Sequence, residues 1–151
     1  MFNIVLFQPE IPPNTGNIIR LCANTGCSLH LIEPLGFKLD DKQLRRAGLD
    51  YHEWATIKTH RDISEIATDN MVYAFSTKGS KHYHEVNYRT GDYLVFGPET
   101  RGLPDYYLDK ISNDRILRLP MRENSRSLNL SNTVAIVTYE ALRQNDFSGI
   151  Y

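Results

Sequence analysis

The sequence predicts an α/β protein in which an open, mainly parallel sheet lies between helices. Short runs of β-branched and aromatic residues alternate along the chain with stretches of helical periodicity. Two of these runs, Met71–Ser76 and Tyr93–Gly97, are almost continuously apolar, which is typical of strands buried on both faces of a parallel sheet. The length of 151 residues, with 41% hydrophobic and 23% charged residues, suffices for one domain with its own core.

Five strands and five helices are expected in alternating order. The strands are predicted at Phe2–Phe7, Leu29–Glu33, Met71–Thr77, Tyr93–Gly97 and Arg115–Pro120. The helices are predicted at Thr15–Cys27, Asp40–Ala47, Asp62–Thr68, Pro104–Ile111 and Leu130–Gln144. No internal repeat, low-complexity tract or linker interrupts this order, so residues 1–151 are expected to form a single domain.

The first predicted helix has two different faces. Asn17, Arg20 and Asn24 are spaced at i, i+3 and i+7 and therefore share one face. The opposite face is expected to pack on the sheet and consists of Ile18, Ile19, Cys22 and Ala23. This helix therefore presents an arginine and two amides to something outside the core.

The last predicted helix is apolar around most of its circumference. In its central part only Glu140 and Arg143 are charged. Its apolar residues there are Val134, Ala135, Ile136, Val137, Tyr139, Ala141 and Leu142. A helix of this type is buried on more than one side, and in a small domain a partner subunit is the more common neighbour. We therefore expect a homodimer that forms through the C-terminal helix.

Composition and cysteine use exclude several classes of protein. The formal net charge of -1 gives no sign of a nucleic-acid binder, so an RNA site would need its basic residues gathered on one side. No apolar run approaches the roughly 20 residues of a membrane span, and Phe2–Phe7 is too short for a signal-peptide core. Cys22 and Cys27 lack the spacing of metal or redox motifs, which suggests a reducing cytoplasm without membrane association.

Several familiar catalytic motifs are absent from the sequence. It has no G-x-G-x-x-G after a strand, no G-x-x-x-x-G-K-[ST] and no G-x-S-x-G. His82 and His84 could offer two metal ligands on one strand face, but no third ligand follows nearby. An exposed pair in a loop is the better interpretation, and no metal is expected.

Three loops follow predicted strands and are rich in glycine, serine, asparagine and proline: Pro12–Arg20, Phe96–Pro104 and Leu119–Ser131. In an open parallel sheet, ligands bind beyond the carboxyl ends of the strands, where all three loops begin. Such residues let the backbone approach a ligand closely. Each loop alone could be a turn or a helix cap, but their joint occurrence favours a ligand site.

The residues of these loops also match known motifs. They read Asn14-x-Gly16-Asn17-Ile18-x-Arg20, Phe96-Gly97-Pro98-Glu99-x-x-Gly102 and Ser125-Arg126-Ser127-Leu128-Asn129-Leu130-Ser131. Together they resemble the three motifs of the SPOUT methyltransferases, and most of all the minimal bacterial subgroup that methylates the wobble nucleotide of tRNA. The resemblance runs from the first strand to the last helix. It implies a C-terminal trefoil knot, a rare feature in which the chain passes through a loop, and a homodimer.

The resemblance further implies an activity and the residues that carry it. S-adenosylmethionine would donate a methyl group to the 2′-hydroxyl of nucleotide 34, a cytidine or modified uridine, in the anticodon stem-loop of tRNA, with tRNA-Leu isoacceptors as expected substrates. Its implied cofactor-binding residues are Phe75, Gly97, Leu119, Met121, Ser127 and Leu128. Arg20 is the implied catalytic residue. The implied RNA contacts are Asn17, Arg126 and Tyr139.

The chemistry of Arg20 restricts its role. An arginine is effectively never deprotonated in proteins, so it is a poor general base. We expect Arg20 to hold a phosphate and to stabilise the developing alkoxide, while a phosphate oxygen or a water removes the proton. A second basic group, Lys42, Arg45 and Arg46, is equally compatible with phosphate contacts and with a solvated helix face.

Two alternatives to this activity remain. A sister enzyme could methylate ribose at another RNA site, although such enzymes usually carry an additional RNA-binding domain. A non-catalytic RNA-binding protein could keep the same fold, in which case the cofactor pocket would be filled or charged. The apolar residues implied for the pocket favour an enzyme.

Overall fold

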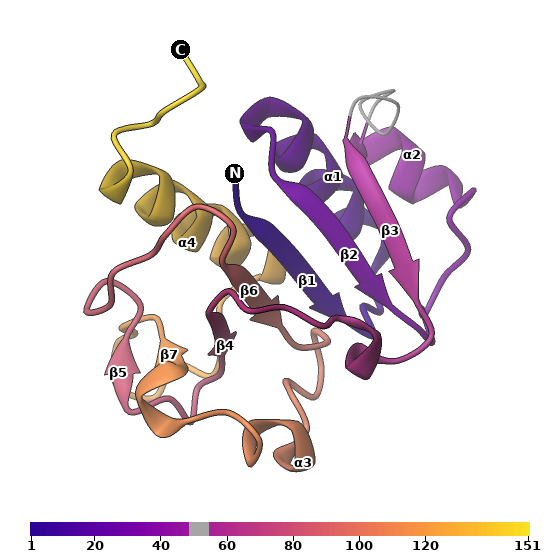
Figure 1. Cartoon of the computed structure of the whole chain (residues 1–151). Helices are drawn as coiled ribbons and strands as arrows, with labels where there is room; N and C mark the ends of the chain where they lie inside the picture. Colours follow the sequence, from indigo (N-terminus) through magenta and orange to yellow (C-terminus); the bar gives the residue numbers. More distant parts are fainter. Residues whose placement is uncertain (49–54) are drawn as a thin grey trace.

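The computed structural model describes residues 1–48 and 55–151, and it confirms the predicted α/β class (Figure 1). The described residues form one sheet of seven strands in the order β3-β2-β1-β6-β4-β7-β5, with every pairing parallel. The strands are β1 (Asn3–Phe7), β2 (Ser28–Ile32), β3 (Thr56–His60), β4 (Val72–Phe75), β5 (Lys81–His82), β6 (Tyr93–Phe96) and β7 (Ile116–Arg118).

Helices cover both faces of this sheet. They are α1 (Pro12–Thr25), α2 (Lys42–Gly48), α3 (Asp105–Leu108) and α4 (Leu130–Gln144), with 3-10 turns at Ile63–Glu65 and Asn113–Arg115. One face packs against α1 and α4, and the other packs against α3 and the first 3-10 turn. Among the described helices, none combines the length and the apolar character that crossing a bilayer requires.

The five predicted strands are confirmed. Two further strands were missed, and two of the predicted helices are shorter than expected. The missed β3 is an outer strand with mostly exposed side chains, and β5 has only two residues, so neither shows the apolar run of a buried strand. The helix predicted at Asp62–Thr68 is a single 3-10 turn, and the one predicted at Pro104–Ile111 has one α-helical turn. α1 begins three residues earlier than predicted because its two prolines occupy the first helical positions.

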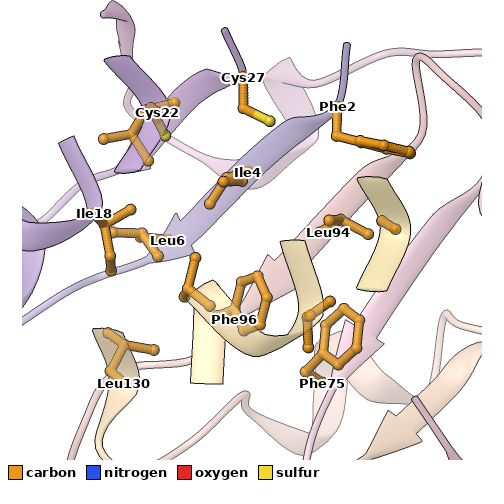
Figure 2. Packing of buried hydrophobic residues seen from close by; sticks show 14 of the residues in the cluster. Phe2, Ile4, Leu6, Ile18, Cys22, Cys27, Phe75, Leu94, Phe96 and Leu130 are labelled. Carbon is orange, nitrogen blue, oxygen red and sulfur yellow. The ribbon is translucent and has the colours of Figure 1, made fainter. Parts of the chain in front are cut away.

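The two faces predicted for the first helix are confirmed. Ile18 and Cys22 of α1 are buried against Ile4 and Leu6 of β1, as Figure 2 shows. Asn17, Arg20 and Asn24 are exposed on the opposite face. The buried face fixes α1 on the sheet, and its N-terminal end therefore lies at the carboxyl edge of β1.

Two aromatic rings mark the place where the core meets that edge. Phe75 and Phe96 end the neighbouring strands β4 and β6, and their rings stack with centroids 4.7 Å apart and an interplanar angle of 11°. Figure 2 shows Leu130, the first residue of α4, on the same side of the sheet. The core thus reaches the carboxyl ends of the central strands. The trefoil knot and the single-domain organisation remain predictions.

A pair of histidines lies between the first three strands, on the side opposite to α1. His30 Nδ1 is 2.9 Å from His60 Nε2, and His30 Nε2 is 3.3 Å from the Oδ1 atom of Asn3. The ring of His30 also contacts Tyr93, at a centroid distance of 5.6 Å. Burial lowers the pKa of His30 to about 4, with further lowering by the charges of His60 and Lys58.

This histidine is expected to make the stability of the fold depend on pH. An unfolded histidine titrates near pH 6.5, so below that pH the unfolded chain binds more protons than the folded one. The free energy of unfolding should therefore fall as the pH decreases from about 6.5 to about 4. Urea unfolding at several pH values measures this slope. His30→Gln should flatten it, the exposed His84→Gln should leave it unchanged, and an equal slope in both variants would contradict the assignment.

Candidate functional site

A cavity of about 580 Å³ lies at the carboxyl ends of β4, β6 and β7. Four segments that are distant in sequence line most of it, namely residues 75–78, 96–103, 117–121 and 126–130. Ile11 and Asn14, at the beginning of α1, and Thr133 of α4 also line it. The cavity therefore occupies the edge of the sheet where ligands bind in open parallel α/β proteins, and its volume suits a small organic ligand.

The structure brings together all six residues that the sequence implied for a cofactor. The cavity is lined by Phe75, Gly97, Leu119, Met121, Ser127 and Leu128. The side chains of Phe75 and Leu119 are buried in its apolar part, whereas Leu128 is 44% exposed. Arg126, implied as an RNA contact, lines the same cavity. One apolar slot with an exposed rim can enclose a flat ring system and leave a polar end accessible.

Gly97 is required by the close approach of two stretches of backbone. A Cβ atom at this position would lie 2.3 Å from the nitrogen of Leu103 and 2.4 Å from the carbonyl carbon of Gly102. The turn that creates this contact is closed by the N–H of Gly102, which donates to the carbonyl of Pro98 at 2.9 Å. Gly102 itself has φ +69°, the left-handed region that favours glycine. The loop after β6 therefore folds back on itself beside the cavity.

A chain of hydrogen bonds joins the three loops that the sequence singled out. The carboxylate of Glu99 accepts the backbone N–H groups of Glu10 and Ile11 at 2.7 and 3.0 Å and the Nδ2 of Asn14 at 3.4 Å. The Oδ1 of Asn14 in turn accepts the Nδ2 of Asn129 at 3.0 Å. One residue from each loop thus takes part in a single network at the edge of the cavity.

Both ends of this network are fixed further. Asn129 is the N-cap of α4, because its Oδ1 accepts the N–H of Asn132 at 3.3 Å and the hydroxyl of Ser131 at 2.7 Å. On the other side, Glu10 accepts the N–H and the hydroxyl of Thr100 at 3.1 and 2.8 Å, and these bonds lower the pKa of Glu10. The start of α4 and the loop after β6 are therefore both held against the start of α1.

Glu99→Gln tests the importance of this network. Glutamine has one oxygen and would turn an NH₂ group toward a backbone N–H, so at least one charge-assisted hydrogen bond is lost. We expect the free energy of unfolding to fall by about 1–3 kcal/mol. Chemical denaturation measures the loss. Glu123→Gln, on the exposed loop before α4, is the matched control, and its free energy of unfolding should change by less than about 0.5 kcal/mol. Equal stability of both variants would contradict the role of Glu99.

Four cationic side chains line the cavity: Lys78, Arg101, Arg118 and Arg126. Lys78 is paired with Asp105, its Nζ lying 2.6 Å from Oδ1. Within the described part of the chain, the buried Nε of Arg118 has no hydrogen-bond partner. A cavity with an apolar interior and several cations can hold a ligand that combines a ring system with an anionic group. Of these four cations, only Arg126 was among the site residues predicted from the sequence; Lys78, Arg101 and Arg118 were missed.

Three of the residues that were implied by the sequence do not line the cavity. Asn17 and Arg20 lie on the exposed face of α1, and Tyr139 is 47% exposed on α4. Arg20 follows Asn14, which does line the cavity, by six residues, or about 9 Å along the helix axis. In a single chain, these three side chains therefore lie outside the lining of the cavity.

The remaining candidate groups from the sequence, a basic group and a pair of histidines, lie outside the lining of the cavity. Lys42, Arg45 and Arg46 are exposed on α2, which packs on α1. The rings of His82 and His84 stack with centroids 5.7 Å apart. Residues 1–48 and 55–151 contain no group of three histidine, cysteine, aspartate or glutamate side chains that could hold a metal ion.

Comparison with known proteins gives consistent matches over the whole chain. A profile of the SpoU rRNA Methylase family matches residues 1–139. The tRNA (cytidine(34)-2'-O)-methyltransferase of Saccharophagus degradans is 63% identical, with 99% of both chains covered. The protein of the same name from Photorhabdus asymbiotica is 59% identical, covering 99% of this chain and 97% of its own.

A solved structure extends this similarity to the fold. It was determined in a study of 2-OH methylation of C/U34 on tRNA, and it is 43% identical to this chain. The two structures superpose with a TM-score of 0.91, and the match covers 97% of each chain. The similarity therefore includes all the elements that form the cavity.

Proposed function

We propose that this chain, which belongs to the SpoU rRNA methylase family, is a methyltransferase acting on tRNA. Its target is the ribose 2′-hydroxyl of cytidine 34. The family membership rests on a match to residues 1–139 and on relatives of 59–63% identity over almost the full chain. The observation that carries the proposal is the cavity at the carboxyl ends of the strands, where three motif loops are joined by one hydrogen-bond network. A modified uridine at position 34 and tRNA-Leu isoacceptors belong to the same proposal.

S-adenosylmethionine is the cofactor that fits this cavity. Phe75, Leu119 and Leu128 offer an apolar slot for an adenine ring, and the tight turn at Gly97 lets backbone groups approach the ligand. Ser127 and Met121 line the same cavity. When bound, the sulfonium of the cofactor supplies an activated methyl group for in-line displacement.

The protein must position the ribose oxygen and assist the loss of its proton. Arg20 is proposed as the catalytic residue: its guanidinium holds a phosphate and stabilises the developing alkoxide, while a phosphate oxygen or water accepts the proton. Asn17 lies on the same exposed face of α1 and is proposed to contact RNA. Arg126, at the cavity, and Tyr139, on α4, are the other proposed RNA contacts.

A homodimer through α4 is part of the proposal. Ile136 and Tyr139 of this helix and the nearby Phe147 are 40%, 47% and 40% exposed, and the rings of Tyr139 and Phe147 lie 6.5 Å apart. Val134 and Val137, on the other side of α4, are fully buried in the core. A second copy would cover the outer apolar residues. Tyr139 would then lie where the subunit interface and the RNA surface meet.

If α4 forms the dimer interface, a charge placed on its outer face should separate the two subunits. Ile136→Glu should reduce the mass in solution from that of two chains to 17.4 kDa, because a carboxylate would be buried in the interface. Met71→Glu places the same charge on a residue that is 48% exposed and immediately precedes β4, and it should leave the mass unchanged. Sedimentation equilibrium distinguishes the two, and a wild-type monomer would contradict the proposal.

Methyl transfer from labelled S-adenosylmethionine tests the activity directly. The acceptor is bulk tRNA from cells that lack this protein, which is digested to nucleosides after the reaction. Label in 2′-O-methylcytidine or a 2′-O-methyluridine derivative at position 34 is the expected result. Label at another tRNA position, or only in ribosomal RNA, would assign the enzyme to the sister activity. Failure to bind the cofactor would leave an RNA-binding protein with the same fold.

A further inference from the structure

A second, smaller cavity opens beside the proposed cofactor site and has no role in the chemistry described so far. Its volume is about 180 Å³, and it shares Pro98, Arg101 and Gly102 with the larger cavity. The end of β1 and the start of α3 supply the rest of its lining. Because the two cavities have this lining in common, a group bound in the small one lies next to a group bound in the large one.

The small cavity combines flat apolar surfaces with hydrogen-bonding groups. Pro98, Pro104 and Tyr106 line it, and Tyr106 is 57% exposed. The polar groups are the amide of Gln8 and the guanidinium of Arg101, whose Nη2 lies 3.4 Å from Gln8 Oε1. An amide has both a donor and an acceptor, and an arginine has donors only, so together they can pair with the edge of a heterocyclic base.

Packing of the core explains neither the exposure of Tyr106 nor the backbone conformation of Gln8. The neighbouring Tyr107 is buried and stacks on Phe7, with centroids 6.2 Å apart, whereas Tyr106 is exposed. Gln8 has a positive φ of 48°, although its N–H still donates to the carbonyl of Ile32 at 3.0 Å. A left-handed conformation is unfavourable for a residue other than glycine, and such residues gather at binding sites.

We propose that this small cavity binds the base of a nucleotide adjacent to nucleotide 34. The inference rests on the proposed function, which places the ribose of that nucleotide at the neighbouring cavity. Tyr106 would stack on the unpaired base, and Gln8 and Arg101 would bond to its edge, which is how proteins read single-stranded loops of RNA. A phosphate is a poorer occupant, because Pro98, Pro104 and the ring of Tyr106 give the cavity apolar surfaces that suit a flat base and not a charged, strongly hydrated anion.

The test measures binding of an anticodon stem-loop RNA to the full chain by fluorescence anisotropy. Tyr106→Ala removes the stacking surface and should weaken binding about tenfold. Tyr106→Phe keeps the ring and should stay within about twofold of wild type. Because Tyr106 is exposed, both variants should fold, which a thermal melt checks, and both should bind S-adenosylmethionine as wild type does.

A second arm locates the base. An abasic site is placed at each loop position in turn, and each RNA is bound by wild type and by Tyr106→Ala. At the nucleotide before or after position 34, the abasic RNA should bind both proteins equally, since the stacking partner is already missing. The inference would be overturned if Tyr106→Ala bound RNA as tightly as wild type, or if it lost the same affinity with the abasic site at every loop position. A changed mass of the variant in sedimentation would also overturn it.

The outcomes separate this inference from the proposed function. If wild type methylates tRNA while Tyr106→Ala binds RNA normally, only the inference fails. If wild type transfers no methyl group to tRNA but the coupling between Tyr106 and one loop base is observed, the base pocket stands and the proposed reaction fails.

Discussion

Replacing Gly97 by alanine should abolish detectable binding of S-adenosylmethionine. The added Cβ would lie 2.3 Å from the nitrogen of Leu103 and 2.4 Å from the carbon of Gly102, and both are backbone atoms that cannot turn aside. The loop after β6 would have to open, at a cost of about 1–3 kcal/mol in stability. Because this loop lines the cavity, we expect the affinity for the cofactor to fall by at least about a hundredfold.

Gly102→Ala is the matched control for this variant. Gly102 lines the same cavity, but a Cβ there would meet no atom within 4 Å, so only its φ of +69° opposes the substitution. That conformation costs a residue with a side chain about 1 kcal/mol. Isothermal titration with the cofactor and thermal melting measure both effects. Cofactor affinity as weak in Gly102→Ala as in Gly97→Ala would show that general loosening of the loop, and not the contact at Gly97, explains the loss.

Arg20→Lys should reduce methyl transfer to tRNA by about a hundredfold or more while leaving the affinity for the cofactor unchanged. Lysine keeps the positive charge but loses the planar fork that binds phosphate through two parallel hydrogen bonds. Removing one donor that stabilises a developing oxyanion typically costs about 10²–10³ in rate. The cofactor should still bind, because Arg20 does not line the cavity.

Single-turnover rates at saturating tRNA, together with cofactor titrations, distinguish the possible roles of Arg20. Full activity of Arg20→Lys would show that only a positive charge is needed. Weaker cofactor binding would show that Arg20 supports the cavity, in contradiction of the role proposed for it. Arg143→Lys is the matched control, because Arg143 is an exposed arginine of α4 that pairs with Glu140 at 2.9 Å, and its activity should be unchanged.

The strands that the sequence predicted correctly are the central ones. β1, β4 and β6 are buried on both faces, and their apolar runs leave a clear signal. β3 lies at one edge of the sheet, and its exposed threonines and lysine give no such run. β5, at the other edge, exists only because its two residues pair with β7. Edge strands depend on a neighbour for their hydrogen bonds, so their sequences predict them poorly.

The candidate site shows a similar division. The resemblance of three loops to known motifs identified six residues that line one cavity, although they come from four segments of the chain. The same motifs contain Asn14, Glu99 and Asn129, but the sequence did not indicate that these side chains bond to one another. They are 85 and 115 residues apart, and only the packing of α1, α4 and the loop after β6 brings them within 3.4 Å.

By itself, then, the sequence determined the α/β class, the central strands, the buried face of α1 and the three loops at the carboxyl edge, because periodicity and turn chemistry are local properties. The residues of the site came from the resemblance of these loops to known motifs. The tertiary structure alone decided three other things. It turned Arg118 into the cavity, it separated Arg20 from the cavity lining, and it placed Tyr106 and Gln8 on one small pocket. Each of these depends on distances between segments far apart in sequence, which are set by how helices and loops pack on the sheet.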